Sequence, residues 1–208
     1  MGAISKRLSI LGTAFSQKVL ADEGSDALVL EGEDDLAGLP DFLIAAAASA
    51  ASERGQAGQH LITLSRSLIE PFLQFSSRRD LRERAFKAWV SRGAWGGDSD
   101  NRALIGEILA LREERARLLG FQSFADFKLD DQMARTPAAV RDLLFKVWKP
   151  AKERAGEETA HLQALANDEG ANFDIAPWDW RYYAEKVRKR DYDLDEAELK
   201  PYLQLDKM

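Results

Sequence analysis

The sequence contains no cysteine and only two histidines, His60 and His161, among its 208 residues. A zinc site in a protein needs several His, Cys, Asp or Glu side chains that converge on the metal. The chain therefore has no disulfide framework, no thiol nucleophile and few of the ligands that zinc prefers. The lack of cysteine fits a cytoplasmic protein, which is the location that we expect.

The sequence also lacks an apolar run of about 18 residues, which excludes a transmembrane helix. Its apolar content of 45% excludes intrinsic disorder. Its net charge is −6, so a basic surface that binds nucleic acid could cover only a small part of the protein. Lys6 and Arg7 precede a short apolar run, as in a signal peptide. Helical spacing indicates an amphipathic helix instead, with these apolar positions: Ile4, Leu8, Leu11, Phe15 and Val19.

Most of the remaining sequence has helical periodicity, and only Ala27–Leu30 and His60–Ser65 are typical of strands. An alanine-rich stretch from about Asp41 to Arg54 lies between them and favours a helix. We therefore predict a mainly α fold, a multi-helix array with one small two-stranded β element at about 27–30 and 60–65. No linker or repeat divides the chain, so residues 1–208 are interpreted as a single helical region.

Later helices are marked by their starts and by their apolar faces. Ser67 and Glu70 have the spacing of a capping box, with Pro71 in the first turn. Thr136 and Pro137 predict the start of a helix that runs to about Asn167 and bends at Pro150. A final helix is expected from Pro177. The predicted inward-facing residues are Leu81, Ala85, Ala88 and Trp89; Leu104, Ile108, Leu111 and Leu118; Val140, Leu143, Leu144, Val147 and Ala151; and Trp180, Tyr183, Ala184 and Val187.

Three short motifs resemble parts of known sites, and each lacks an essential component. Glu158-x-x-His161 has di-iron spacing, but such bundles need a second pair and two further glutamates. Asp191-x-Asp193-x-Asp195 starts like a calcium loop, yet Glu196 replaces the required glycine. Gly97-Asp98-Ser99 resembles a serine-hydrolase block, but neither histidine follows with the spacing of a base. We favour surface positions for these residues and assign no catalytic, cofactor-binding or metal-binding residue.

The segment WRYYAEKVRKRDY interleaves aromatic and basic side chains, as some nucleic-acid surfaces do. Acidic residues interrupt the positive charge, and the aromatic residues recur at core-facing positions of a helix. We therefore interpret it as a buried face with a solvated opposite face, and we expect no nucleic-acid partner.

Four segments, taken in order, resemble the thimet-oligopeptidase family of zinc metallopeptidases. They are LGTAFSQKVL, RDLRERAFKAWVSRG, LALREERARLLGFQSFADFKLDDQMA and PWDWRYYAEKVRKRDYDLDEAELKPYL. PWDW and YDLDEAELKPY are most similar to bacterial peptidyl-dipeptidase, also called dipeptidyl carboxypeptidase. The resemblance extends from about Leu8 to Met208 and implies part of a two-lobed helical enzyme that hydrolyses short peptides in a channel between its lobes.

In that family the resemblance implies a zinc held by H-E-x-x-H and a further glutamate, with the motif's glutamate as general base. This sequence has no H-E-x-x-H. We therefore expect an internal fragment of the enzyme: a non-catalytic part of its helical wall, inactive alone, with zinc only in the full-length parent. Its partners would be the remaining segments of the peptidase, and through them short peptides.

A second hypothesis remains open: a stand-alone helical module that binds peptides or proteins without enzymatic activity. For the isolated chain we also expect exposed apolar surface and self-association. That surface should be centred on the first helix and on Tyr202, Leu203 and Leu205.

Overall fold

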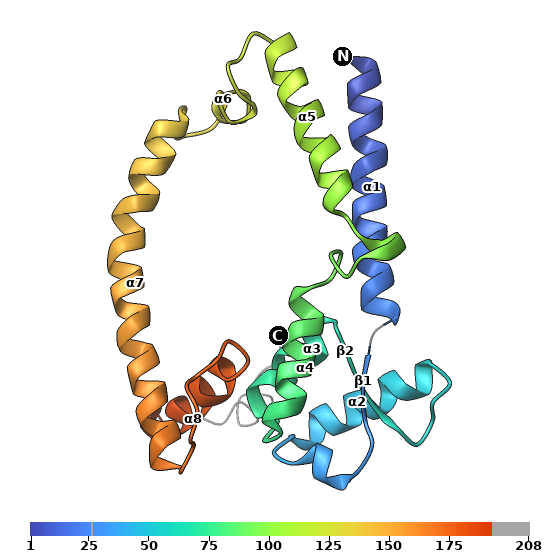
Figure 1. Cartoon of the computed structure of the whole chain (residues 1–208), viewed down its shortest axis with the longest axis vertical. Helices are drawn as coiled ribbons and strands as arrows, with labels where there is room; N and C mark the ends of the chain where they lie inside the picture. The colour runs from blue at the N-terminus through green and yellow to red at the C-terminus, as the bar shows by residue number, and fades with distance from the viewer. Residues whose placement is uncertain (26, 193–208) are drawn as a thin grey trace, which may run out of the picture. The chain divides into compact units, whose positions relative to one another are not determined.

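The computed structural model describes residues 1–25 and 27–192, and these form eight α-helices, two short 3-10 helices and two strands. Figure 1 shows the order of these elements along the chain by colour. The packing divides the chain into two compact units. Unit 1 comprises residues 1–27 and 88–156, and unit 2 comprises the described residues of 28–87 and 157–208. The division falls inside the helices α4 (Arg79–Val90) and α7 (Pro137–Asp168), so no linker separates the units.

The small sheet has the two predicted strands, β1 (Ala27–Leu30) and β2 (His60–Thr63). The helix α2 (Asp41–Glu53) packs on β2, and Leu43, Ala47 and Ala51 of this helix are fully buried. Because alanine side chains are small, the helix can approach the strand closely. A 3-10 helix, η1 (Glu33–Leu36), precedes α2. The mainly α fold with one two-stranded element is confirmed, although β2 ends two residues earlier than predicted.

The start of α3 (Arg66–Phe75) differs from the predicted capping box. Ser65, not Ser67, occupies the cap position, and its carbonyl accepts the N–H of Ile69 at 2.9 Å. The Ser65 hydroxyl lies 2.8 Å from the Thr63 hydroxyl instead of binding a free amide of the helix. Pro71 consequently lies in the second turn. The capping box was wrong because α3 already begins at Arg66, directly after the extended Ser65, which places Ser67 inside the helix.

The helix α8 (Trp180–Tyr192) closes the described part of unit 2 and begins three residues later than predicted. It packs against α3 and contributes to a core cluster that also contains the C-terminal part of α7. The buried members are Leu162, Ala166 and Tyr183. Trp180, Ala184 and Val187 pack around them, so the predicted inward face of this helix is confirmed.

In unit 1 the helix α1 (Gly2–Ser25) packs on α5 (Arg102–Leu118), with Ile4 and Leu11 of α1 buried. Buried Asp22 accepts the backbone N–H of Gly93 at 2.6 Å, which connects α1 to the turn after α4. The rest of α1 exposes Ile10 and Leu20, as expected from the sequence. Tyr202, Leu203 and Leu205, the other part of that expected surface, lie outside the described residues.

The predicted inward face of α5 is partly wrong. Leu118 is exposed, whereas Ala116 is fully buried. The chain reverses through Gly120 and packs the short helix α6 (Phe124–Leu129) against α5, with the Phe121 N–H bonded to the Ala116 carbonyl at 3.0 Å. The contact with α6 therefore covers the Ala116 side of the last turn instead of the Leu118 side.

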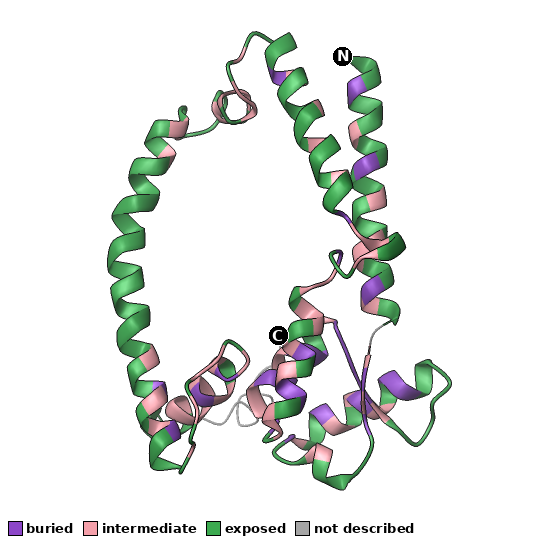
Figure 2. Cartoon of the chain, in the orientation of Figure 1, coloured by how far each residue is buried: buried purple, intermediate pink, exposed green. Residues whose placement is uncertain are grey.

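The largest difference from the sequence prediction concerns α7. The Thr136 hydroxyl accepts the N–H of Ala139 at 3.2 Å, which confirms the predicted helix start. The expected inward residues Leu143, Leu144 and Val147 are nevertheless 64%, 60% and 58% exposed, and Ala151 is exposed too. Figure 2 shows this exposure along most of the helix, whose buried residues are Leu162 and Ala166 near its end. Helical periodicity predicted an apolar face correctly, but no described segment of unit 1 covers it.

The helices within residues 1–25 and 27–192 include no candidate membrane-spanning segment.

Candidate functional site

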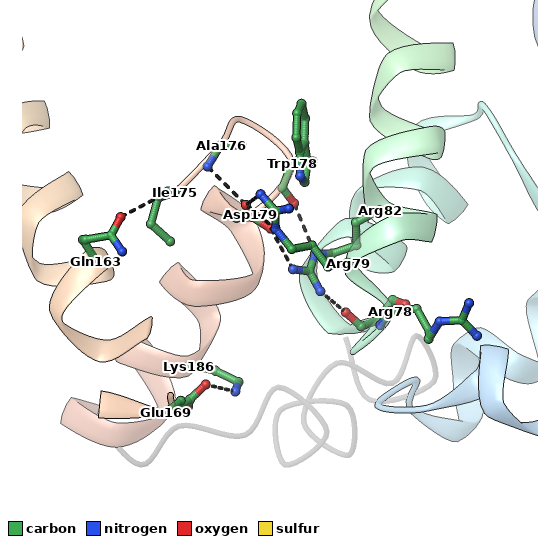
Figure 3. Close-up of polar contacts among 11 residues, drawn as sticks. Arg78, Arg79, Arg82, Gln163, Glu169, Ile175, Ala176, Trp178, Asp179 and Lys186 are labelled. Atoms are coloured by element: carbon green, nitrogen blue, oxygen red, sulfur yellow. Dashed lines mark hydrogen bonds and ion pairs between the residues drawn. The ribbon is translucent and has the colours of Figure 1, made fainter. Parts of the chain in front are cut away.

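The most strongly connected polar group in unit 2 is the carboxylate of Asp179, which is completely buried just before α8 (Figure 3). The Arg82 Nη2 atom donates to its Oδ1 at 2.8 Å, and the Arg79 Nη2 atom donates to its Oδ2 at 2.9 Å. The backbone N–H of Ala176 also donates to Oδ2, at 3.1 Å. Two helix-borne arginines thus converge on one carboxylate.

Arg82 is 1% exposed, although arginine is rarely buried unless it is paired. Besides Asp179, its guanidinium donates to the carbonyl of Ser76 at 2.7 Å and to that of Trp178 at 3.3 Å. These bonds satisfy donors on all three guanidinium nitrogens. The cost of burying this cation is therefore offset by one charge and two backbone acceptors.

Aromatic rings cover both guanidinium groups. The Arg79 Cζ atom lies 4.0 Å from the centroid of the Phe173 ring, and the Arg82 Cζ atom lies 4.0 Å from that of Tyr182. Flat guanidinium groups stack well on aromatic faces, and such contacts strengthen when water is excluded. We call Arg79, Arg82, Asp179 and these rings the Asp179 cluster.

The sequence places the Asp179 cluster through two local features. Arg79 and Arg82 are three residues apart and so lie on neighbouring positions of one face of α4. The turn before α8 is closed by the Asp179 N–H, which donates to the Ala176 carbonyl at 2.9 Å. The Gln163 side chain fixes the preceding loop, accepting the Ile175 N–H at 2.8 Å and donating to the Phe173 carbonyl at 2.9 Å.

The chemistry of the Asp179 cluster is structural. An arginine remains protonated and cannot act as a base, and the Asp179 oxygens are already occupied by donors. Nearby, Lys186 pairs with Glu169 at 2.6 Å, and burial raises the pKa of the Tyr183 phenol. None of these groups is a free nucleophile beside a base, so the arrangement holds α4 against α8 and offers no reactive centre.

The residues considered for chemistry in the sequence lie apart in the structure. His60 begins β2, whereas Glu158 and His161 are exposed neighbours on α7, so the two histidines lie on different elements. Ser99 lies in the 3-10 helix η2 (Gly97–Ser99). Within residues 1–25 and 27–192, no three His, Cys, Asp or Glu side chains are grouped so that they could hold a metal ion. Asp193 and Asp195 lie outside the described residues.

Asp100 lies just before α5 and binds the backbone at the start of this helix. Its Oδ1 atom accepts the N–H of Arg102 at 2.8 Å, and its carboxylate also pairs with the Arg102 guanidinium. The hydrogen bonds from Arg102 lower the pKa of Asp100 to about 2.

We expect a carbon-detected NMR titration to find the midpoint of Asp100 near pH 2 and that of the Arg102→Gln variant closer to an ordinary aspartate. Because the folded pKa lies below the unfolded one, this contribution to stability is present above the unfolded pKa of about 3.9. It disappears as the pH falls toward 2. A midpoint near 4 in the unchanged chain would contradict the bond.

Comparison with known proteins identifies the family to which the chain belongs. The model of peptidase family M3 matches residues 72–208, which include both halves of the Asp179 cluster. The chain belongs to peptidase family M3. This confirms the resemblance to the thimet-oligopeptidase family.

Two curated relatives illustrate the M3 match. Dipeptidyl carboxypeptidase of Escherichia coli is 38% identical over 202 residues, which cover 97% of this chain and 30% of the relative. Oligopeptidase A of Salmonella typhimurium is 37% identical over 206 residues, with the same two coverages. This M3 chain therefore spans about 30% of the length of these relatives.

The described residues do not fit the zinc centre that the family resemblance implies. The only histidines are His60 and His161, cysteine is absent, and no group of three ligands occurs in the part of the chain that the structure describes. We therefore derive no catalytic step through a metal for this M3 chain.

The sequence missed the Asp179 cluster, which is the main polar feature of this M3 unit. The helix expected from Pro177 would have Asp179 in its first turn, where the helix dipole stabilises a carboxylate. In the structure Asp179 is instead buried and paired with Arg82 and Arg79. The position of Arg82 could have indicated the cluster. Arg82 lies three residues before buried Ala85 and therefore on the same inward face of α4. An arginine on an apolar face predicts a buried acidic partner, although the sequence does not say which one.

Proposed function

We propose that this chain forms part of the helical wall of an M3 peptidase that hydrolyses oligopeptides and releases dipeptides from their C-termini. In this proposal the chain carries no catalytic residue, and the zinc belongs to parts of the peptidase that it does not include. Its partners are those remaining segments and, through them, short peptides in the cytoplasm. The observation that carries the proposal is the alignment of 97% of the chain with 30% of a dipeptidyl carboxypeptidase.

The Asp179 cluster supports a role in the framework. It joins α4 and α8 through residues 97 positions apart in the sequence, and its donors and acceptors are used within the fold. A part of an enzyme that positions other parts needs this kind of rigid internal connection. The release of dipeptides is the more specific part of the proposal, since it depends on the branch of the family. Dipeptidyl carboxypeptidase and oligopeptidase A match this chain almost equally well, at 38% and 37% identity.

We expect the purified chain neither to hold stoichiometric zinc nor to release dipeptides from an oligopeptide with a free C-terminus. With two histidines far apart in the sequence and no cysteine, the described part of the chain offers zinc no group of three ligands, and water at neutral pH is a poor nucleophile without the metal. Metal analysis and a peptide assay with and without a chelator measure both points. Turnover that the chelator abolishes would contradict the proposal, and chelator-resistant turnover would direct mutagenesis to Ser99.

A chimera tests the wall role directly. The counterpart of this chain in E. coli dipeptidyl carboxypeptidase is replaced by the chain itself, and dipeptide release is compared with the unmodified relative. We expect the chimera to release dipeptides in a chelator-sensitive reaction. A soluble, folded but inactive chimera would instead favour the second hypothesis, an interaction module without enzymatic activity.

A further inference from the structure

The middle of α7 is exposed on all sides. Every residue of 141–153 is exposed, which corresponds to about three and a half turns of helix (Figure 2). The buried residues of α7, Leu162 and Ala166, come later and belong to unit 2. Most helical stability in proteins comes from packing one face of the helix, and this segment lacks that contribution.

Two residues also weaken the backbone of this part of α7. Pro150 has no N–H, so the helical bond that the Lys146 carbonyl would accept from it is missing. Gly156 loses more conformational entropy in a helix than alanine does. A Cβ atom at Gly156 would meet nothing within 4 Å, so no close contact requires a glycine there. Exposure and a weak backbone together favour local opening of this segment.

Local opening has a chemical consequence, because a protease cuts the opened form of a segment and not the intact helix. Arg141, Lys146 and Lys152 are exposed in the segment and suit a serine endopeptidase that cuts after basic residues. Such an enzyme adds water across the peptide bond that follows the basic residue. One piece then ends in a new carboxylate, and the other begins with a new amine.

The two pieces would remain connected within unit 2, since this unit combines residues 28–87 with the described residues of 157–208. Asp179 on the C-terminal piece pairs with Arg82 and Arg79 of α4, at 2.8 and 2.9 Å. The pair with Arg82 is completely buried, so water does not compete for it readily.

Contacts between α3 and α8 add to this connection. The Gln74 side chain donates to the Glu185 carboxylate at 2.8 Å, and Glu70 pairs with Arg181 at 3.1 Å. None of these contacts involves the exposed segment of α7, so a cut in that segment leaves them intact.

We propose that residues 141–153 are a site of limited proteolysis, and that the Asp179 cluster holds the two pieces together after the cut. The proposal is independent of the peptidase role, because it concerns contacts within the chain alone.

Brief digestion with trypsin tests the site. We expect early cuts after Arg141, Lys146 or Lys152, identified from the masses of the pieces. Arg54, in the exposed turn that follows α2, is the reference site, because a cut there requires no opening of a long helix. A chain whose residues 141–153 stay intact during the digestion would overturn the proposal.

Variants of the helix test whether opening controls the cuts. Pro150→Ala supplies the missing N–H and should slow the cuts after Lys146 and Lys152 by about tenfold or more, and Gly156→Ala by about threefold. The matched control is Gly106→Ala in α5, where a Cβ atom also meets nothing within 4 Å. This variant should leave both rates unchanged. If all three variants are cut at the same rate, opening of α7 does not control the cuts and the proposal fails.

Size-exclusion chromatography of the cut chain tests how the pieces are held. We expect them to elute together in buffer and to separate when urea is added. Arg79→Lys loses the two-nitrogen contact with Asp179, so its pieces should separate at a urea concentration lower by about 0.5 M or more. Glu70→Ala removes an exposed ion pair and should behave like the unchanged chain. Pieces that separate without urea, or equal behaviour of the two variants, would contradict the role of the Asp179 cluster.

Discussion

Replacing Asp179 with alanine is expected to lower the free energy of unfolding by about 3–5 kcal/mol, because it leaves a buried arginine without its counter-charge. Arg82 is 1% exposed and its Nη2 atom donates to Asp179 at 2.8 Å, so water cannot readily replace the lost carboxylate. The Ala176 N–H and the Arg79 guanidinium lose an acceptor in the same variant. Urea denaturation followed by tryptophan fluorescence measures the change, since Trp178 adjoins the substituted residue.

The matched control is Glu70→Ala, which removes a surface ion pair with Arg181 at 3.1 Å. Exposed pairs contribute about 0–1 kcal/mol, so this variant should unfold almost as the unchanged chain does. A double variant, Asp179→Ala with Arg82→Met, should recover part of the loss, because it also removes the unpaired buried charge. If Asp179→Ala unfolds like Glu70→Ala, the buried pair does not hold α4 to α8.

Substituting Gly38 with alanine is expected to destabilise the chain by about 2–5 kcal/mol, from backbone strain plus a steric clash. Gly38 has φ of +83°, and a Cβ atom there would lie 2.5 Å from both the Phe75 carbonyl oxygen and the Ser77 hydroxyl oxygen. The carbonyl belongs to the last residue of α3 and cannot move away as a flexible side chain can. The Ser77 N–H also donates to the Ala37 carbonyl at 2.9 Å, which fixes the two segments at this close approach.

Gly55→Ala separates the two components of that effect. Gly55 has φ of +73°, yet a Cβ atom there meets nothing within 4 Å. Its substitution should therefore cost only the backbone strain, about 1–2 kcal/mol. Thermal denaturation of both variants gives the comparison, and equal losses would show that the contact near Gly38 relaxes without cost.

Local sequence patterns predicted the elements that depend on local physics. The alanine-rich stretch forms α2, the two β-branched and apolar runs pair as the sheet, and the Thr136–Pro137 start of α7 is capped as expected. These features depend on residues within a few positions of one another. The aromatic face of α8 was also predicted, because Tyr183 and its neighbours recur at helical spacing.

The errors concern questions that local spacing does not determine. Periodicity shows that one side of α7 is apolar, but it does not specify which segment covers that side, and Leu144 is exposed in this chain. The Asp179–Arg82 pair was missed because its members are 97 residues apart and each has an ordinary local role, a helix-start acid and a helix-surface base. The family resemblance came from the order of several segments, and so it was visible before any contact was known.

Unit 2 is built from two separate stretches of the chain, and this affects how it forms during protein synthesis. Arg82 leaves the ribosome 97 residues before Asp179, and at about 5–20 residues per second this delay is on the order of 5–20 s. Throughout that interval the nascent α4 has a cationic side chain and an apolar face with no partner from α8. Closing so long a loop is also slow compared with forming a helix. Unit 2 can therefore complete its buried Arg82–Asp179 pair only after the start of α8 has emerged.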